Sequence, residues 1–437
     1  MLKLFLWLRY LGKRRVVLLS IAAVALSCAL LIVVASIFNS FINAFEQAAV
    51  DSIGDVVIAP PMNITDCTQL TDKLEEINVV EAATATLSTH GLLHLGRGNV
   101  RAVEIWGIDV QKQGKVTAFE KSLLKGNSQE PNNQLINGYI GIGVLGEPNE
   151  KTDEYDFESA KATIGREVVL TTGSTLEGRD GNRQFKRQTI QLVVSDVVFT
   201  GVYYLDKQVV YLPIEQLREA IYPASKQTIA DQIHVKLHNG ADEEVAIAEI
   251  RGVWKTFAEQ KLGWEPALIQ VARIETARQM QARYVAEFRK QMGILLLIFG
   301  VVSLSAVLLV FCIFYMIVER QRRDIAILKS CGADSAAVAS IFVGFGLFVG
   351  TLGTLLGIAL GYLVTKNIDI VEGGIRIVFG LKLWKSSVYM FSKIPNTVDW
   401  QAVLWIAASA IAGAAIGALI PAISAAVTKP VNVLRYE

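Results

Sequence analysis

The sequence predicts an α-helical membrane protein in which one transmembrane helix, a large α+β extracytoplasmic domain and three further transmembrane helices follow one another along the chain. Apolar residue types make up 52% of the 437 residues and charged types only 19%, whereas soluble globular chains average about 25% charged residues. The apolar excess is concentrated in four stretches without a charged residue, which are residues 16–38, 293–318, 341–364 and 403–427. This composition argues against a fully soluble enzyme and against a disordered chain. The net charge of +1 gives no sign of a nucleic-acid-binding surface, so we expect no nucleic-acid partner.

Each uncharged stretch is long enough to cross a membrane. The shortest has 23 residues, and at a rise of about 1.5 Å per residue it spans about 35 Å, more than the hydrocarbon core of about 30 Å. The first stretch is too long for the apolar part of a signal peptide, and no small-residue cleavage site follows it. We therefore expect four transmembrane helices and a first helix that is retained.

Basic residues at the start of the chain predict its orientation. Residues 1–15 contain five Lys or Arg and no acidic residue, which favours a cytoplasmic N-terminus, and four crossings then return the C-terminus to the cytoplasm. Basic residues also precede the second stretch, but long segments are translocated largely regardless of their charge. The expected regions are an amphipathic cytoplasmic lead-in (1–15), the first span (16–38), the outer domain (39–292), the second span (293–318), a cytoplasmic segment (319–340), the third span (341–364), an outer loop (365–402), the fourth span (403–427) and a cytoplasmic tail (428–437).

The outer domain has the pattern of short helices and strands. We expect strands at 55–59, twice within 92–108, at 167–171, 190–194, 209–212 and 233–238, and helices at 65–77, 213–221, 241–261 and 274–291. The last of these helices runs directly into the second span, and residues 173–183 are polar and Gly-rich and are expected to form a loop. Cys67 is the only one of four cysteines in this domain, so no intramolecular disulfide can stabilise it.

Catalytic signatures are missing from the sequence. There is no phosphate-binding loop, no HExxH motif and no GxSxG motif. Two pairs of histidines have a spacing of four, His90 with His94 and His234 with His238, but both pairs lie in expected strands, where four residues span about 13 Å. We therefore expect surface histidines in strands, and a non-catalytic chain without a metal or cofactor of its own.

Small residues mark one face of the third span. Five of its six glycines are separated by four, three, four and four residues, which places them on one helical face; they are Gly346, Gly350, Gly353, Gly357 and Gly361. Faces of this kind let helix backbones approach closely in lipid, either within one chain or between two protomers. Because no ionisable residue lies inside any span, an ion channel or a secondary transporter is disfavoured.

The segment 319–333 is basic and amphipathic, and two interpretations of it remain open from its residues alone. It is either a solvated turn between two spans or a docking element for a cytoplasmic partner. Gly332 suits the residue after a helix C-cap, and Asp334 or Ser335 can cap the next helix. The residues expected to couple to a partner are Arg320, Arg323, Asp324, Ile325, Leu328, Lys329 and Gly332.

Arg323–Lys329 followed by Gly332-Ala333 resembles the coupling helix of the FtsX-like permeases of ABC transporters. The C-terminal Lys429–Glu437 is similar to their ending, and the layout of one plus three helices around a large outer domain is also theirs. Within that family the lipoprotein-releasing branch is the most similar, on the segments Leu8–Tyr10, Thr200–Asp206 and Trp384–Pro395.

The resemblance implies a fold, partners and a mode of action. It implies a homo- or heterodimer of permeases in the bacterial inner membrane, two cytoplasmic ABC ATPase chains that bind ATP and Mg²⁺, and a lipid-anchored substrate passed to a possible periplasmic carrier or adaptor. ATP-driven closure would move the coupling helices and, through them, the outer domains. Two alternatives within the same family are export of a periplasmic drug or peptide, and activation of a cell-wall hydrolase without transport.

The first and second spans offer only apolar and small polar side chains. A dimer built from them would enclose an apolar vestibule that is open to lipid, and acyl chains could enter it at little net cost because they gain nearly as much in the bilayer. The residues expected to line this vestibule are Leu30, Val34, Phe38, Leu297, Val301 and Leu304.

Overall fold

The computed structural model describes residues 15–96, 98–126, 136–149, 155–177, 183–223, 225, 227–379, 384–385, 391 and 393–428. The chain divides into two compact units. The first unit comprises Met1–Asn43, Ala286–Gly374 and Ile394–Glu437, and the second comprises Ala44–Val285 and Ile375–Lys393. Helices α2 and α11, and the shorter helix α14 (Ile368–Phe379), each contribute residues to both units. Residues 1–14 of the predicted lead-in (1–15) and residues 429–437 of the predicted tail (428–437) lie outside the described residues.

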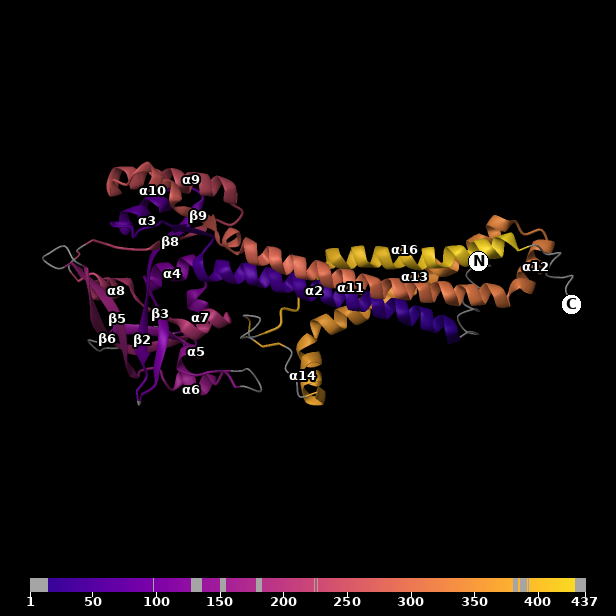
Figure 1. The fold of residues 1–437 in the computed structure, drawn as a ribbon, viewed down its shortest axis with the longest axis horizontal. Coiled ribbons are helices and arrows are strands. Elements are labelled where there is room, and N and C mark those ends of the chain that lie inside the picture. The colour runs from indigo at the N-terminus through magenta and orange to yellow at the C-terminus, as the bar shows by residue number, and fades with distance from the viewer. Residues whose placement is uncertain are drawn as a thin grey trace. The chain divides into compact units, whose positions relative to one another are not determined.

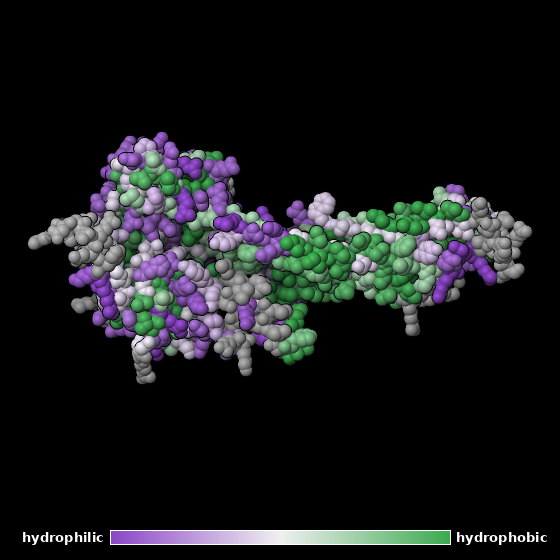
Figure 2. All heavy atoms as spheres, in the orientation of Figure 1, coloured by the Kyte–Doolittle hydropathy of each residue, from purple (hydrophilic) through white to green (hydrophobic). Residues whose placement is uncertain are grey.

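The first unit is built from long helices (Figure 1). Four helices are long and apolar enough to cross a membrane: α2 (Arg15–Ile53), α11 (Ala277–Arg320), α13 (Ser335–Lys366) and α16 (Trp400–Val427). Two shorter helices, α12 (Arg322–Ser330) and α14 (Ile368–Phe379), follow α11 and α13. Apolar side chains cover much of the outer surface of the long helices, as Figure 2 shows. The predicted layout of one helix, an outer domain and three helices is confirmed.

Helices α2 and α11 extend well past the uncharged stretches. α2 continues to Ile53, and α11 begins at Ala277, so that the polar residues before the second span belong to the same helix as the span itself. This continuity was expected, although the first residues of the expected helix, 274–276, belong to strand β9 (Arg273–Thr276) instead. Strand β9 pairs with β1 at the edge of the sheet.

The core of the first unit lies where the ends of the spans come together near α12. Phe314 of α11 and Phe345 of α13 are almost fully buried, and their ring centroids are 5.3 Å apart. Val17 of α2 and Ala422 of α16 complete the same cluster. Helix α16 continues through Pro421, which is buried in this region.

The second unit contains a nine-stranded sheet with the order β3-β7-β4-β6-β5-β2-β8-β1-β9, in which β2 also pairs with β3. The order and the extra pairing make a closed ring of six strands, from which β8, β1 and β9 extend beside β2. The strands are β1 (Val56–Ala59), β2 (Val80–His94), β3 (Val100–Ile108), β4 (Ile136–Gly141), β5 (Glu167–Glu177), β6 (Arg183–Val198), β7 (Val209–Pro213), β8 (Gln232–Leu237) and β9 (Arg273–Thr276).

Strand β2 joins the two hydrophobic cores of this unit. Its first half, Val80–Thr86, pairs with β8 beside a core that contains Leu70, Trp254 and Phe257. Its second half, Leu87–His94, pairs with β3 in a core formed by the strand ring. The helices that cover the sheet are α3 (Cys67–Glu75), α4 (Val110–Val116), η1 (Phe119–Ser122), α5 (Ile142–Leu145), α6 (Phe157–Lys161), α7 (Tyr203–Gln208), α8 (Ile214–Ile221), α9 (Glu243–Phe257), η2 (Ala258–Leu262) and α10 (Pro266–Val271).

One predicted loop is wrong in part. Residues 173–177 extend strand β5, which pairs with β6 as far as Glu177 opposite Arg183. The prediction failed because these polar and Gly-rich residues lack the apolar alternation of a half-buried strand. Two strands of a hairpin can nevertheless continue to pair through their backbones beyond the core. Asp66 occupies the N-cap position of α3 without a side-chain hydrogen bond, because its φ of 56° places it in the left-handed region.

The histidines lie in or beside strands as expected, but His234 is not on the surface. His234 is 1% exposed on β8, and its ring faces Trp106 at a centroid distance of 6.4 Å. Burial lowers the pKa of His234 to about 4. Among the described residues no group of three His, Cys, Asp or Glu could hold a metal ion. Cys67 is also fully buried, and Arg218 donates a hydrogen bond from Nη2 to its Sγ at 3.1 Å.

Candidate functional site

The segment expected to couple the chain to a partner forms helix α12, which a single residue separates from α11. This residue, Gln321, has φ −106° and ψ 12°, so it is not helical. It is nonetheless 5% exposed, and its backbone N–H donates to the carbonyls of Ile317 and Val318 at 3.1 Å each. The chain therefore changes direction between α11 and α12 at a buried and hydrogen-bonded residue, which makes this junction well defined.

The apolar residues of α12 face two sides. Ile325 is 2% exposed and packs with the ends of the spans, whereas Ile327 is 52% exposed and Leu328 46% exposed. Ile325 was expected to contribute to a docking surface, but its burial among the spans leaves it no surface to offer. Spacing alone paired Ile325 with Leu328, and it could not tell which apolar residue the protein's own spans would cover. The exposed apolar pair is Ile327 and Leu328.

The charged residues around α12 surround this pair. Arg320, Arg323 and Asp324 are exposed, and Arg322 forms an ion pair with Glu319 at 2.8 Å. Lys329 is partly buried, and its Nζ donates to the carbonyl oxygens of Ala426 at 2.6 Å and Thr428 at 3.0 Å. These carbonyls lie at the C-terminal end of α16, where an ammonium group satisfies acceptors that have no partner within the helix. Lys329 thus connects α12 to α16.

The end of α12 is defined by Gly332. Its φ is 95°, a conformation that glycine adopts without steric cost. The N–H of Ala333 donates to the carbonyl of Leu328 at 3.1 Å, and that of Gly332 to the carbonyl of Lys329 at 3.1 Å, which is the pattern of a Schellman motif. The expected position of Gly332 after the C-cap is confirmed, and Asp334 occupies the N-cap position of α13 without a side-chain bond.

The glycines of α13 contact two other helices of the same chain. A Cβ atom added to Gly350 would lie 2.8 Å from Cβ of Ala414, and one added to Gly346 would collide with Ala418, both on α16. These distances are shorter than carbon atoms tolerate, so the backbones of α13 and α16 are in direct contact because the glycines lack a side chain.

The other three glycines of the face lie against α2. A Cβ added to Gly357 would lie 2.7 Å from Cβ of Cys28 and 2.8 Å from the carbonyl oxygen of Ala25. Gly353 and Gly361 approach the same helix at Val24 and Ile32. One face of α13 therefore holds α16 near one end and α2 near the other, within one chain.

Helix α11 has a different environment. Only 6% of its most apolar 18-residue window is buried, against 44% for α13. Three residues expected to line a vestibule are among the exposed ones, with Leu297 69%, Val301 60% and Leu304 58% exposed. On α2, Leu30 is 36% exposed and Val34 and Phe38 are partly exposed. The six side chains are thus available to lipid or to another chain, rather than being used in the core.

In the second unit, two segments that are far apart in the sequence meet. Val202, which precedes α7, pairs as an isolated antiparallel bridge with Phe391, and Trp384 Nε1 donates to the carbonyl of Phe391 at 3.0 Å. The segment 384–391 comes from the loop between α13 and α16. The sequence contains no local signal for this contact, because neither segment has the pattern of a strand.

Asp206 supports the turn that makes this contact. Its carboxylate, which is 1% exposed, accepts hydrogen bonds from Thr200 N at 2.7 Å, Thr200 Oγ1 at 2.8 Å and Gly201 N at 3.0 Å. Burial raises the pKa of Asp206 to about 6, although the hydrogen bonds from Thr200 and Gly201 oppose this shift. The carboxylate holds a turn in place and faces no nucleophile, so its role is structural.

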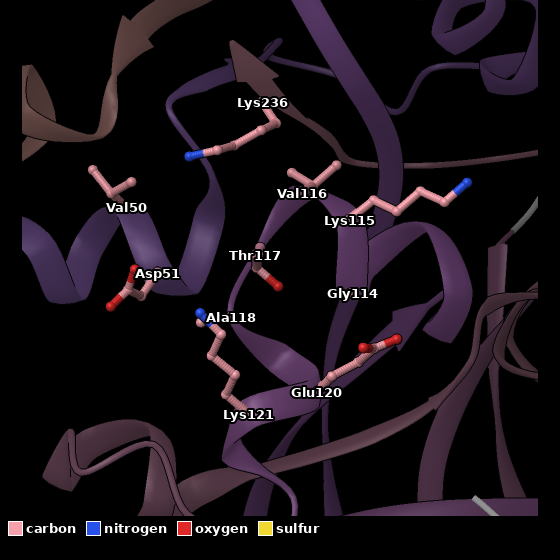
Figure 3. A pocket seen from close by; sticks show the side chains of 10 residues that line it. All are labelled: Val50, Asp51, Gly114, Lys115, Val116, Thr117, Ala118, Glu120, Lys121 and Lys236. Atoms are coloured by element: carbon pink, nitrogen blue, oxygen red, sulfur yellow. The ribbon is translucent and has the colours of Figure 1, made fainter. Parts of the chain in front are cut away.

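A cavity of about 280 Å³ in the second unit is lined by residues of α2, α4, η1 and β8 (Figure 3). Two of its charged residues already have partners: Lys236 forms an ion pair with Asp55 at 3.1 Å, and Asp51 accepts a hydrogen bond from Gln47. The ammonium group of Lys115 points away from the cavity in Figure 3. Its lining contains no nucleophile paired with a base, and it gives no support for catalysis.

Comparison with known proteins agrees with this architecture. The family model of the MacB-like periplasmic core domain matches residues 17–253, and that of the FtsX-like permease C-terminal domain matches residues 296–430. The chain is 27% identical over 448 residues to the lipoprotein-releasing system transmembrane protein LolC of Neisseria meningitidis, covering 100% of this chain and 99% of the relative. It is 24% identical to the lipoprotein-releasing system transmembrane protein LolE of Haemophilus influenzae, covering 95% of this chain and 93% of the relative.

Among solved structures, the periplasmic region of MacB from Actinobacillus actinomycetemcomitans matches with a TM-score of 0.32 and 13% identity, covering 54% of this chain and 95% of that one. The family model of the periplasmic core covers more than half of the present chain. The permease model covers the chain from within α11 to the end of α16. The chain belongs to the family with a MacB-like periplasmic core domain and an FtsX-like permease C-terminal domain.

Proposed function

We propose that the chain is the permease subunit of an ABC transporter that releases lipoproteins from the bacterial inner membrane. The observation that carries this proposal is the match to LolC and LolE, whose names describe lipoprotein-releasing proteins and which align over nearly their whole lengths. The exposed apolar side chains of α11 add a physical reason, because a lipid-anchored substrate needs an apolar surface that is reachable from the bilayer.

Several further parts of the proposal come from the same family. Two permease protomers, identical or different, assemble with two cytoplasmic ATPase chains that bind ATP and Mg²⁺, and this chain does not hydrolyse ATP itself. The N-terminus, α12 and the C-terminus lie in the cytoplasm, and the second unit lies outside, where a soluble carrier or adaptor receives the substrate. Gln321 and Lys329 support the coupling role of α12, since both fix this helix to the spans.

Photo-crosslinking tests the substrate. A crosslinker at Leu297, Val301 or Leu304 should capture a triacylated lipoprotein when the chain is in its complex, and ATP should reduce the yield. The same should hold for Leu30, Val34 and Phe38. The matched control is Leu355 of α13, which is 58% exposed but lies on a different helix; it should capture phospholipid only.

Two outcomes would contradict lipoprotein release. Equal capture of lipoprotein at Leu355 and Val301 would mean that lipoproteins merely contact any apolar surface in the membrane. Capture of a soluble peptide at Val301, together with correctly sorted lipoproteins after depletion of the chain, would favour the export function of the same family.

A second experiment tests the coupling role of α12. The substitutions Ile327→Asp and Leu328→Asp should each weaken ATPase binding, because apolar residues at the centre of an interface commonly contribute about 2 kcal/mol or more. Co-purification of the ATPase and its stimulated hydrolysis are the measurements. Ala336→Asp adds the same charge to an exposed site outside α12 and should leave both unchanged. Normal co-purification and hydrolysis with Leu328→Asp would exclude α12 as the docking element.

A further inference from the structure

Helix α14 (Ile368–Phe379) has no buried residue, although most of its residues are apolar. Asp369, Glu372 and Arg376 are separated by three and four residues, so that all its charges lie on one face. The apolar residues occupy the remaining and wider face. Several are strongly exposed: Ile370 73%, Ile377 84%, Val378 73% and Phe379 69%. An exposed apolar face of this extent on a regular helix needs a partner that is not water.

The start of α14 lies close to the point where α13 leaves the apolar part of the membrane. Only Asn367 separates Lys366, the last residue of α13, from Ile368. Asn367 ends α13 with φ −111° and ψ 32°, and its carbonyl accepts hydrogen bonds from the N–H groups of Ile370 and Val371, which begin the new helix. α14 therefore starts at the level of the α13 terminus, with no linker that could carry it away into solution.

Aromatic residues mark this level as the membrane surface. Tyr362 of α13 and Trp400 of α16 stack with ring centroids 6.1 Å apart, and both are more than a third exposed. Trp and Tyr are enriched where the hydrocarbon meets the headgroups. Asn396 Nδ2 donates to the carbonyl of Lys366 at 3.1 Å, which ties the approach to α16 to the end of α13. The first residues of α14 follow this aromatic level directly.

We propose that α14 lies in the plane of the membrane surface, with its apolar face in the headgroup–acyl boundary of the leaflet in which α13 ends. A helix with one strongly charged face and one apolar face binds the bilayer interface in this way. The occupant of the apolar face is phospholipid, because the helix begins at the interface itself, directly after the membrane-spanning α13. This inference depends on the four spans and not on what the chain transports.

Lipid contact can be measured in the full chain reconstituted in phospholipid vesicles without ATPase or lipoprotein. Single cysteines are introduced as Ile377→Cys and, on the charged face, Asp369→Cys, in a background in which the exposed Cys312 and Cys331 are replaced by Ala. Cys28 and Cys67 are buried and remain. Each new cysteine carries a fluorophore that is sensitive to polarity. Quenchers are iodide in the water and a nitroxide on carbon 5 or carbon 12 of the lipid chain.

The expected result is blue-shifted emission at Ile377→Cys, with nitroxide quenching about twofold or more above that at Asp369→Cys and strongest for the shallow quencher, as for a helix buried about 5–10 Å into the interface. Iodide should show the reverse order. Val378→Cys is a second probe of the apolar face if the Ile377 variant does not fold, which size-exclusion chromatography reports.

Three results would overturn the proposal. Equal iodide quenching at both positions would place the apolar face in water. Protection of Ile377→Cys from both iodide and lipid quenchers would mean that protein, such as a second copy of the chain, covers it. Stronger quenching by the deep than by the shallow nitroxide would place the helix inside the hydrocarbon core.

Discussion

The uncharged stretches of helices α11 (293–318) and α13 (341–364) have similar lengths but opposite relations to the rest of the first unit. α13 contacts α16 and α2 through a glycine face, and 44% of its most apolar window is buried, whereas the corresponding share in α11 is 6%. Glycines are present in both helices, yet a Cβ added to Gly293 or Gly300 of α11 would meet no atom within 4 Å. The difference teaches that a small residue in a transmembrane helix has a packing role only where another backbone reaches it.

The largest expected effect comes from filling the glycine face. Gly357→Leu should prevent α13 from reaching α2, because even a Cβ at this position would lie 2.7 Å from Cys28, and overpacking a core commonly costs about 1–3 kcal/mol or more. The thermal midpoint of the chain in detergent should fall, or the protein should aggregate. Gly300→Leu is the matched control and should leave the midpoint within a few degrees. Equal losses in the two variants would remove the distinction between the helices.

Protonation of His234 at acid pH should destabilise the second unit and leave the glycine contacts unaffected, since those contain no titratable carboxylate or base. The pKa of His234 is about 4 in the folded chain and 6.5 when exposed, so the unfolded state binds the proton more tightly. Its contribution is complete above pH 6.5 and is lost as pH falls towards 4, by about 3 kcal/mol. Thermal scans from pH 7.5 to 4.5 should show this loss when the unaltered chain is compared with a variant that lacks His234.

The substitution His234→Phe isolates this contribution. Relative to the unaltered chain, its thermal midpoint should rise as pH falls over the same interval. Asp206, whose pKa is raised to about 6, has the opposite sign, because its folded form holds the proton more tightly and loses stability as pH rises from 4 to 6. An unchanged pH profile for His234→Phe would show that the buried histidine is not the responsible group.

A smaller loss of stability is expected at the N-terminal end of α16. Asp399 caps α16 by accepting hydrogen bonds from Gln401 N at 2.9 Å and Ala402 N at 3.1 Å, and it also accepts one from Asn39 Nδ2 on α2. Asp399→Ala should cost about 2 kcal/mol, of which the cap and the bond to Asn39 each supply about half. Asn39→Ala removes only the second bond and should lower the thermal midpoint about half as much. Equal shifts would mean that the cap contributes nothing.

Much of the fold could be predicted because the relevant signals are local. Long uncharged stretches identified the spans, and the alternation in residues 233–238 identified β8. The pairing of β2 with β3, β5 and β8 could not be predicted, because register depends on partners that are distant in sequence. Helix α14 was overlooked within the outer loop, since the search for uncharged stretches passes over a helix with three charges.

The candidate site could be predicted only in part for a related reason. The motif around residues 320–332 located α12 and its terminal Gly332, because capping is encoded by neighbouring residues. Which side of α12 is free depends on the spans that cover Ile325, and the role of Lys329 depends on carbonyls almost a hundred residues later. The five glycines suggested close helix contacts, but their partners on α2 and α16 follow from tertiary structure alone.

The attachment of α12 at two points has a mechanical consequence. Gln321 joins it to α11 through the backbone, and Lys329 joins it to the end of α16 through two hydrogen bonds. The two attachments are eight residues apart, which is about 12 Å along a helix. A short rod held at both ends cannot swivel about either one, so a force applied to its exposed face produces torque on two membrane helices at once. Replacing Lys329 would leave α12 held by Gln321 and by the buried Ile325, without its hydrogen bonds to the end of α16.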